Sequence, residues 1–161
     1  TLVASLFYDN RVLVAHLGDS RLYLLRDGGL RQVTRDHSLL QEQIDSGLLT
    51  LEQAKNAQHK NLVTKALGID PSVEPEIHEY PTRPNDIYLL CSDGLCDMVD
   101  DDEIGATLLT LGANLKLAAQ QLVQMANDNG GRDNVSVILV RVLREYPGAR
   151  GVIAKVFAWL K

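Results

Sequence analysis

The stretch Asp86-Ile-Tyr-Leu-Leu-Cys-Ser-Asp-Gly94 is the part of the sequence that decides the fold. Its first half is an apolar run too short for a helix, and it is bounded by Pro84 on one side and by the turn-forming Ser92-Asp-Gly94 on the other. Such a run is typical of a strand buried on both faces. We therefore predict a buried strand over 86–91 whose end presents Asp93 at the edge of a sheet.

Asp19 and Asp133 occupy comparable positions, each where a predicted strand meets a turn that contains glycine. Asp19 lies in Gly18-Asp-Ser-Arg21, and Asp133 lies in Gly130-Gly-Arg-Asp-Asn134. Asp-Gly and Asp-Asn pairs are common turn formers, so each residue taken alone fits an ordinary turn. Carboxylates held at strand ends can also bind hard cations, and oxygen ligands favour Mg²⁺ or Mn²⁺. The residue types by themselves leave both interpretations open.

Hydrophobic periodicity predicts strands in the first part of the chain. Residues 1–34 alternate with the two-residue period of half-buried strands. Asp9-Asn10 and Asp27-Gly-Gly29 can close tight hairpins, because Asn and Gly accept positive φ angles. These features predict an antiparallel meander. The prolines between 71 and 84 indicate an extended segment, since proline cannot donate a helical hydrogen bond.

The remaining segments have helical spacing. Short helices are expected within 38–67, where Thr50-Leu-Glu-Gln53 has the pattern of a capping box. Asp100 and Asn114 are expected to cap two further helices, and a final strand is expected over 135–142. Antiparallel strands and helices in this order predict an α+β domain in which helices cover the sheets.

Composition and charge define the broad class of protein. At 161 residues and 45% hydrophobic content, the chain is long enough for one domain with a core. Its net charge of −5, with scattered basic residues, predicts no nucleic-acid partner. No apolar run reaches the roughly 18 to 20 residues that span a bilayer, and no signal-peptide pattern is present. We predict a cytoplasmic monomer without a transmembrane segment.

Cysteine and histidine residues provide no metal-binding pattern of their own. The spacing of Cys91 and Cys96 matches no zinc motif, and a low cysteine count fits a reducing compartment. We interpret Cys91 as a small core residue. The histidines lack the paired spacing of zinc-binding helices and are interpreted as structural or solvent-exposed. They are His16, His37, His59 and His78.

Four ordered segments carry a more specific signal. They are Val14-Ala-His-Leu-Gly-Asp-Ser-Arg-Leu-Tyr23, Thr34-Arg-Asp-His-Ser38, Leu89-Leu-Cys-Ser-Asp-Gly-Leu-Cys-Asp97 and Gly130-Gly-Arg-Asp-Asn-Val-Ser-Val137. In their order and spacing, the chain resembles the carboxyl-terminal portion of a bacterial type 2C (PPM) metal-dependent serine/threonine protein phosphatase. The resemblance implies an antiparallel β-sandwich flanked by helices. It implies a partial catalytic domain over 1–143 and a flap over 36–68. Outside the resemblance, the spacing of apolar residues predicts an amphipathic tail over 144–161.

The resemblance also implies roles for individual residues. Asp93 and Asp133 would bind a binuclear metal centre and act in catalysis through a metal-bound water. Asp19 would bind a third ion together with Asp93. Ser38 would belong to the flap, a segment beside the cleft that influences substrate choice in the family.

Three further residues are expected to support the metal ligands. Gly94 would allow the backbone to approach an ion closely. Asn134 would hold the turn around Asp133 through side-chain hydrogen bonds, and Arg21 would pair with a nearby carboxylate.

The activity implied by the resemblance is hydrolysis of phosphoserine or phosphothreonine monoesters, with two or three Mn²⁺ or Mg²⁺ ions as cofactors. The substrate would be a phosphorylated protein, with a cognate serine/threonine kinase or its targets as candidates. The amino-terminal strands of the family pattern are missing, with their phosphate-binding arginine and metal-bridging aspartate. The alternative is therefore a truncated, non-catalytic domain with a regulatory or interaction role. A calcium-binding domain is a third interpretation, although no EF-hand loop is present.

Overall fold

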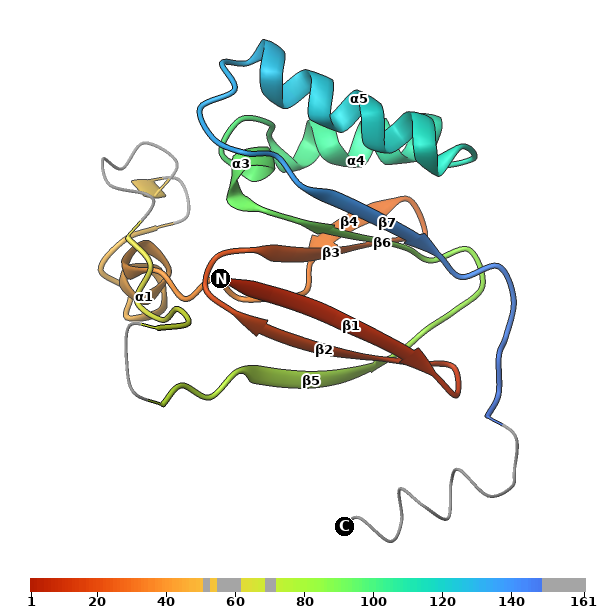
Figure 1. The fold of residues 1–161 in the computed structure, drawn as a ribbon, viewed down its shortest axis with the longest axis horizontal. Helices are drawn as coiled ribbons and strands as arrows, with labels where there is room; N and C mark the ends of the chain where they lie inside the picture. The colour runs from red at the N-terminus through yellow and green to blue at the C-terminus, as the bar shows by residue number, and fades with distance from the viewer. Residues whose placement is uncertain (51–52, 55–61, 69–71, 149–161) are drawn as a thin grey trace, which may run out of the picture.

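The computed structural model describes residues 1–50, 53–54, 62–68 and 72–148, and within these ranges the strands form two antiparallel sheets (Figure 1). The small sheet has the order β1-β2-β5, and the large sheet has the order β4-β3-β6-β7. The strands are β1 (Leu2–Tyr8), β2 (Arg11–Leu17), β3 (Arg21–Arg26), β4 (Gly29–Gln32), β5 (Glu76–Pro81), β6 (Ile87–Cys91) and β7 (Val137–Arg141).

Strand β6 is buried along its whole length, as the apolar run predicted. Because side chains alternate across a strand, β6 contributes to two different cores. Tyr88 and Leu90 belong to the cluster that lies between the two sheets. Leu89 and Cys91 belong to the cluster that the large sheet shares with the helices. This double burial makes β6 a central element of the fold.

Helices cover the outer face of the large sheet (Figure 1), and together with the sheets they confirm the predicted α+β class. Asn114 caps its helix as predicted, because its side-chain oxygen accepts from the N–H of Leu117 at 3.2 Å. Asp100 caps its helix as predicted, and its N–H donates to Glu103 at 3.3 Å in a capping box. Among the described residues, no helix is long and apolar enough to cross a membrane. The helices are α3 (Asp93–Cys96), α4 (Asp101–Leu111) and α5 (Leu115–Asp128).

The predicted antiparallel meander is wrong. Strands β1 and β2 form a hairpin in the small sheet, whereas β3 and β4 form a hairpin in the large sheet. The chain crosses between the sheets at Gly18, whose φ of +95° lies in the left-handed region that favours glycine. The second neighbour of β2 is therefore β5, which forms in the proline-rich segment that was predicted only as extended.

The predicted flap contains helix α1 (Leu39–Asp45), which Ser38 caps by accepting from the N–H of Gln41 at 3.2 Å. Two main-chain hydrogen bonds close its base, one from Leu39 to the carbonyl of Leu62 and one from Thr64 to the carbonyl of His37. The reciprocal bonds of the predicted capping box at Thr50-Leu-Glu-Gln53 are present. Residues 51–52 and 55–61 of the predicted flap lie outside the described residues.

The start of the predicted tail lies beside the β1–β2 hairpin. The N–H of Tyr146 donates to Asn10 at 2.6 Å, and the N–H of Gly148 donates to Asp9 at 2.7 Å. The rest of the predicted tail, residues 149–161, lies outside the described residues. The boundaries at 143 and 144 remain predictions.

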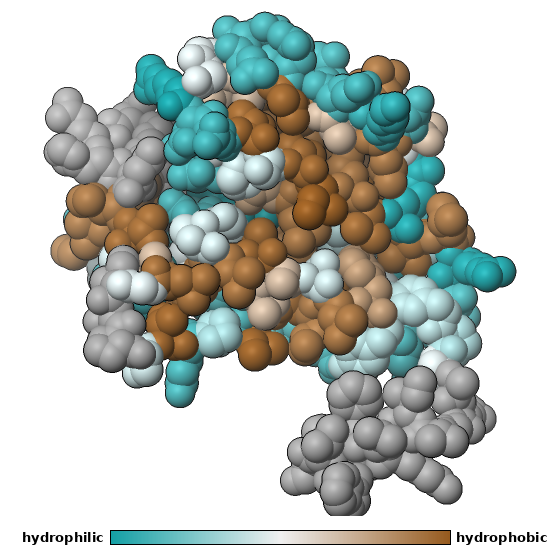
Figure 2. Space-filling view, in the orientation of Figure 1, coloured by the Kyte–Doolittle hydropathy of each residue, from teal (hydrophilic) through white to brown (hydrophobic). Residues whose placement is uncertain are grey.

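One edge of the sandwich exposes apolar side chains. Strands β1 and β7 are end strands of their sheets, and Figure 2 shows hydrophobic side chains gathered on the face where they lie. Leu6 is 56% exposed and Ile138 is 60% exposed. Main-chain groups on such strand edges are free to pair with further backbone.

Candidate metal centre

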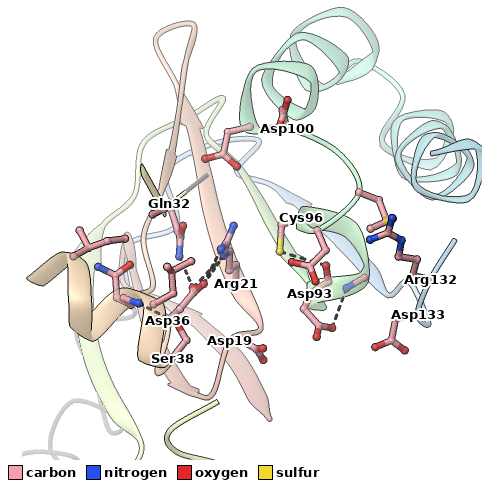
Figure 3. A pocket seen from close by; sticks show the side chains of 18 of the residues that line it. Asp19, Arg21, Gln32, Asp36, Ser38, Asp93, Cys96, Asp100, Arg132 and Asp133 are labelled. Atoms are coloured by element: carbon pink, nitrogen blue, oxygen red, sulfur yellow. Dashed lines mark hydrogen bonds and ion pairs between the residues drawn. The ribbon is translucent and has the colours of Figure 1, made fainter. Parts of the chain in front are cut away.

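The three predicted carboxylates line a single cavity at one end of the sandwich. Asp19 follows β2, Asp93 follows β6 and Asp133 precedes β7, so segments of both sheets converge there. The cavity has a volume of about 1060 Å³. Figure 3 shows the three side chains along one side of it. Residues that are more than 100 positions apart in the sequence therefore share one site.

The turns that carry Asp93 and Asp133 pack directly on each other through Gly94. A Cβ atom on Gly94 would lie 2.5 Å from the main-chain oxygen of Asn134 and 3.4 Å from that of Asp133. Only glycine allows this approach, because the atoms that it meets belong to the backbone and cannot rotate away. Gly94 thus acts by holding two carboxylate-bearing turns together.

Ser92 joins the same two turns by hydrogen bonds. Its hydroxyl donates to the carbonyl oxygen of Asn134 at 3.0 Å and accepts from the N–H of Ser136 at 3.0 Å. The N–H of Ser92 also donates to the carbonyl of Ser136 at 3.1 Å. The role of Ser92 was missed in the sequence, because its partners lie more than 40 residues away.

Each carboxylate is oriented by the N–H of the next residue. Asp93 accepts from Gly94 at 2.9 Å, and Asp133 accepts from Asn134 at 2.6 Å. Asn134 was expected to hold this turn through its side chain, but the structure gives that role to its main-chain N–H and carbonyl. Among the described residues, neither carboxylate forms an ion pair with Lys, Arg or His.

The electrostatics of the cavity favour a bound cation. Burial raises the pKa of Asp19, and the neighbouring carboxylate of Asp93 raises it further. Asp36 and Asp97 contribute in the same direction. Like charges raise a carboxyl pKa because the ionised form is repelled by its neighbours. A divalent cation among these oxygens would remove that repulsion, so the donor set fits Mg²⁺ or Mn²⁺.

Arg21 pairs with Asp36, at the start of the flap, rather than with a predicted metal ligand. Its Nε lies 3.0 Å from both carboxylate oxygens, and its Nη2 lies 2.7 Å from Oδ2. Gln32 donates to the same carboxylate at 2.7 Å. Burial would lower the pKa of Arg21, but its hydrogen bond to Asp36 contributes to a net rise above the ordinary value. Asp36 and Gln32 were not singled out in the sequence.

The other side of the cavity is also acidic. Asp97 is the C-cap of α3, and its N–H donates to the carbonyl of Asp93 at 2.8 Å. Arg132, which precedes Asp133, lines the cavity together with Arg21. The further carboxylates that line it are Asp100, Asp101 and Asp102. A cluster of this kind needs counter-charge, which supports a cationic occupant.

A second group of potential ligands consists of His16, His37 and Glu76, whose donor atoms lie within 4.8 Å of one another. Hydrogen bonding argues against a metal here. His37 Nδ1 accepts from the N–H of Gly18, so its proton is on Nε2, which donates to Glu76 at 3.2 Å. His16 Nε2 lies 2.8 Å from the carbonyl of Arg35 and also carries a proton. The rings are stacked at 15°, so their lone pairs do not converge.

This histidine group therefore ties the flap to β2 and β5, which fits the structural role predicted for histidines. His16 is 1% exposed, and His78 also bonds to Glu76, at 2.6 Å. The sequence contained no signal for the group, because Glu76 lies on the strand that was not predicted. His59 lies outside the described residues.

The fold and the cavity define the protein as an α+β sandwich with an acidic cavity at its strand ends. No family model matches the sequence. The chain is 41% identical over 140 residues to the serine/threonine phosphatase stp of Listeria welshimeri, an alignment that covers 87% of this chain and 55% of that protein. Over most of its length the chain is thus homologous to protein phosphatases of the type 2C (PPM) family.

Solved structures agree with this assignment. The crystal structure of the Mycobacterium tuberculosis serine/threonine phosphatase PstP/Ppp matches with a TM-score of 0.82 and 41% identity, over 88% of this chain and 59% of that one. The catalytic domain of PstP in complex with two manganese ions matches with a TM-score of 0.78 and 40% identity, over 88% and 57%. The chain thus spans little more than half the length of the proteins that it resembles.

Proposed function

We propose that the chain is part of a metal-dependent serine/threonine protein phosphatase that hydrolyses phosphoserine and phosphothreonine monoesters. The observation that carries the proposal is that Asp19, Asp93 and Asp133 come from three separate segments and line one cavity. The mutual repulsion that acts on Asp19 adds to the argument, since it is relieved by a cation.

The cofactors proposed are two Mn²⁺ or Mg²⁺ ions, with a third ion shared by Asp19 and Asp93. The similar PstP catalytic domain was solved with two manganese ions. When bound, divalent ions supply the positive charge that activates water and neutralises the phosphoryl oxygens. Asp93 and Asp133 would hold them, and the packing of Gly94 on Asn134 would keep these two carboxylates at a constant separation.

The substrate proposed is a phosphorylated protein, with a serine/threonine kinase or the targets of that kinase as candidates. The flap, whose helix α1 begins after Ser38, borders the cavity through Leu40, Gln41 and Ile44. Its side chains are therefore placed to contact residues that flank a phosphorylated serine or threonine. The monomeric state and the cytoplasmic location remain predictions.

The alternative function is a non-catalytic module of the same fold, which binds metal without hydrolysis. It is the second candidate because Arg21, one of the two guanidinium groups lining the cavity within the described ranges, is bound to Asp36. Among the described residues, Arg132 is then the one guanidinium group lining the cavity without a carboxylate partner, which leaves a single guanidinium for a phosphate group. Measured turnover separates the two candidates.

The test is hydrolysis of an aryl phosphate and of a phosphothreonine peptide, with and without Mn²⁺. We expect Asp93→Asn and Asp133→Asn each to lower the rate by about 100-fold or more, because each removes a metal ligand. Asp128→Asn is the matched control, because Asp128 ends α5 and bonds only to Gln124 among the described residues.

Calorimetry with Mn²⁺, Mg²⁺ and Ca²⁺ completes the test. Binding of Mn²⁺ that both variants abolish, without any turnover, would favour the non-catalytic module. A preference for Ca²⁺ over Mn²⁺ would favour the calcium-binding interpretation. Turnover that is unchanged in Asp93→Asn and Asp133→Asn would refute the proposed site.

A further inference from the structure

Two free cysteines lie on either side of the Asp93 turn. Cys91 is the last residue of β6 and is 3% exposed. Cys96 is the last residue of α3, is partly exposed and lines the cavity. Figure 3 shows the sulfur of Cys96 on the cavity side of this turn. One thiol is therefore accessible from the cavity, and the other is enclosed in the core.

The local geometry brings the two thiols together. The chain reverses direction after Cys91, and the Cys96 Sγ atom lies 3.9 Å from the carbonyl of Ser92 and 3.6 Å from that of Asp93. Cys91 pairs with Arg21 across the β3–β6 ladder, so both side chains lie on the same face of the large sheet. The nearby Cys96 thiol raises the pKa of both Cys91 and Arg21, so these three groups are neighbours on this face of the sheet.

We propose that Cys91 and Cys96 are a dithiol site that closes to an intramolecular disulfide on reaction with a hydroperoxide. The Cys96 sulfur attacks the peroxide, whose O–O bond breaks, to give a Cys96 sulfenic acid and one alcohol or water. The Cys91 thiol then displaces hydroxide from that sulfur, so that an S–S bond forms and water leaves. Two thiols are oxidised and one peroxide is reduced.

The difference in exposure assigns the order of the two steps. Cys96 can meet a dissolved oxidant through the cavity, whereas Cys91 packs against the apolar cluster beneath the helices. The closed ring would contain Ser92, Asp93 and Gly94, which are the residues that orient one carboxylate and dock its turn on Asn134. Oxidation would thus constrain the turn that positions the Asp93 carboxylate. The dithiol itself does not depend on the proposed phosphatase activity.

The experiment is titration of the reduced chain with hydrogen peroxide, followed by intact-mass measurement and peptide mapping. We expect loss of two hydrogens, a single Cys91–Cys96 cross-link within one chain, and full recovery with a thiol reductant. The chain contains no other cysteine, so each single variant leaves one thiol. Cys91→Ala should instead gain oxygen at Cys96. In Cys96→Ser, the remaining Cys91 thiol should react with peroxide about tenfold more slowly than the wild-type thiols do.

Two results would overturn the proposal. One is oxygen addition at Cys96 of the wild type without loss of hydrogens, and the other is a cross-link that forms only between chains. A trivalent arsenical that bridges paired thiols provides a measurement without oxidation. It should bind the wild type and neither variant, and equal binding to Cys91→Ala would also overturn the proposal. Circular dichroism of each variant checks that it is folded.

Discussion

Replacing Gly94 with alanine tests whether main-chain packing sets the separation of Asp93 and Asp133. The new Cβ atom would lie 2.5 Å from the carbonyl oxygen and 3.0 Å from the carbonyl carbon of Asn134. An ordinary contact needs a retreat of about 0.9 Å, and both sides of the contact are backbone. Overpacking of this kind costs about 1 to 3 kcal/mol, which corresponds to a fall in Tm of roughly 2 to 12 °C.

The same retreat moves the Asp93 turn away from the Asp133 turn, so Mn²⁺ should bind about tenfold or more weakly to Gly94→Ala. Thermal unfolding and calorimetry measure the two effects. Gly29→Ala is the control, because its Cβ would lie 3.7 Å from the carbonyl of Arg26, at ordinary contact distance. Wild-type values of both Tm and Mn²⁺ affinity in Gly94→Ala would refute the reasoning.

Two further predictions concern stability. Arg26→Met should lower the free energy of unfolding by about 3 to 5 kcal/mol, because the carboxylate of Asp86, which is 2% exposed, loses the guanidinium that lies 2.7 Å away. Urea unfolding measures this change. The double variant Arg26→Met/Asp86→Leu should recover most of the lost stability. Burial tends to raise the pKa of Asp86, but hydrogen bonds from Arg26 and from the N–H of Arg83 hold it below its ordinary 3.8. The ion pair should therefore contribute its full stabilisation above pH 3.8 and lose it as the pH falls through the lowered pKa of Asp86. The free energy of unfolding as a function of pH measures this. The same pH dependence in the wild type and in Arg26→Met would contradict the prediction. Ser92→Ala should cost about 1 kcal/mol, because it removes two hydrogen bonds between the turns; an unchanged urea midpoint would argue against the role of Ser92.

The elements that the sequence predicted are those whose signals are local. The strand ending at Cys91 is bounded by proline and by turn residues, and the caps at Asp100 and Asn114 act within one helical turn. Strand β5 was missed because prolines surround it, and its partner within the described residues, β2, lies 60 to 70 residues earlier. A two-residue period also does not determine which strands pair with each other. The chain crosses between the sheets at Gly18, so the first four strands form two hairpins in different sheets instead of the predicted meander.

The site was predicted in part for a similar reason. Asp19, Asp93 and Asp133 stand in recognisable short segments, so their residue types and order were visible. The contacts that position them were not visible, since Ser92 and Gly94 act on Asn134, which lies 40 or more residues away. The pairing of Arg21 with Asp36 belongs to this second group, because it depends on how the flap is docked.

The cavity combines a rigid frame with an unbalanced charge. Burial and the repulsion of Asp93 raise the pKa of Asp19, and main-chain contacts with the Asp133 turn restrict the movement of Asp93 that would relieve this repulsion. Arg21 cannot relieve it either, because its guanidinium is bound by Asp36. Among the described residues, eight aspartates and two arginines line the cavity, so its carboxylates outnumber its guanidinium groups and favour a cation from solution. We therefore expect these carboxylates to bind a divalent cation, which would remove the repulsion between them.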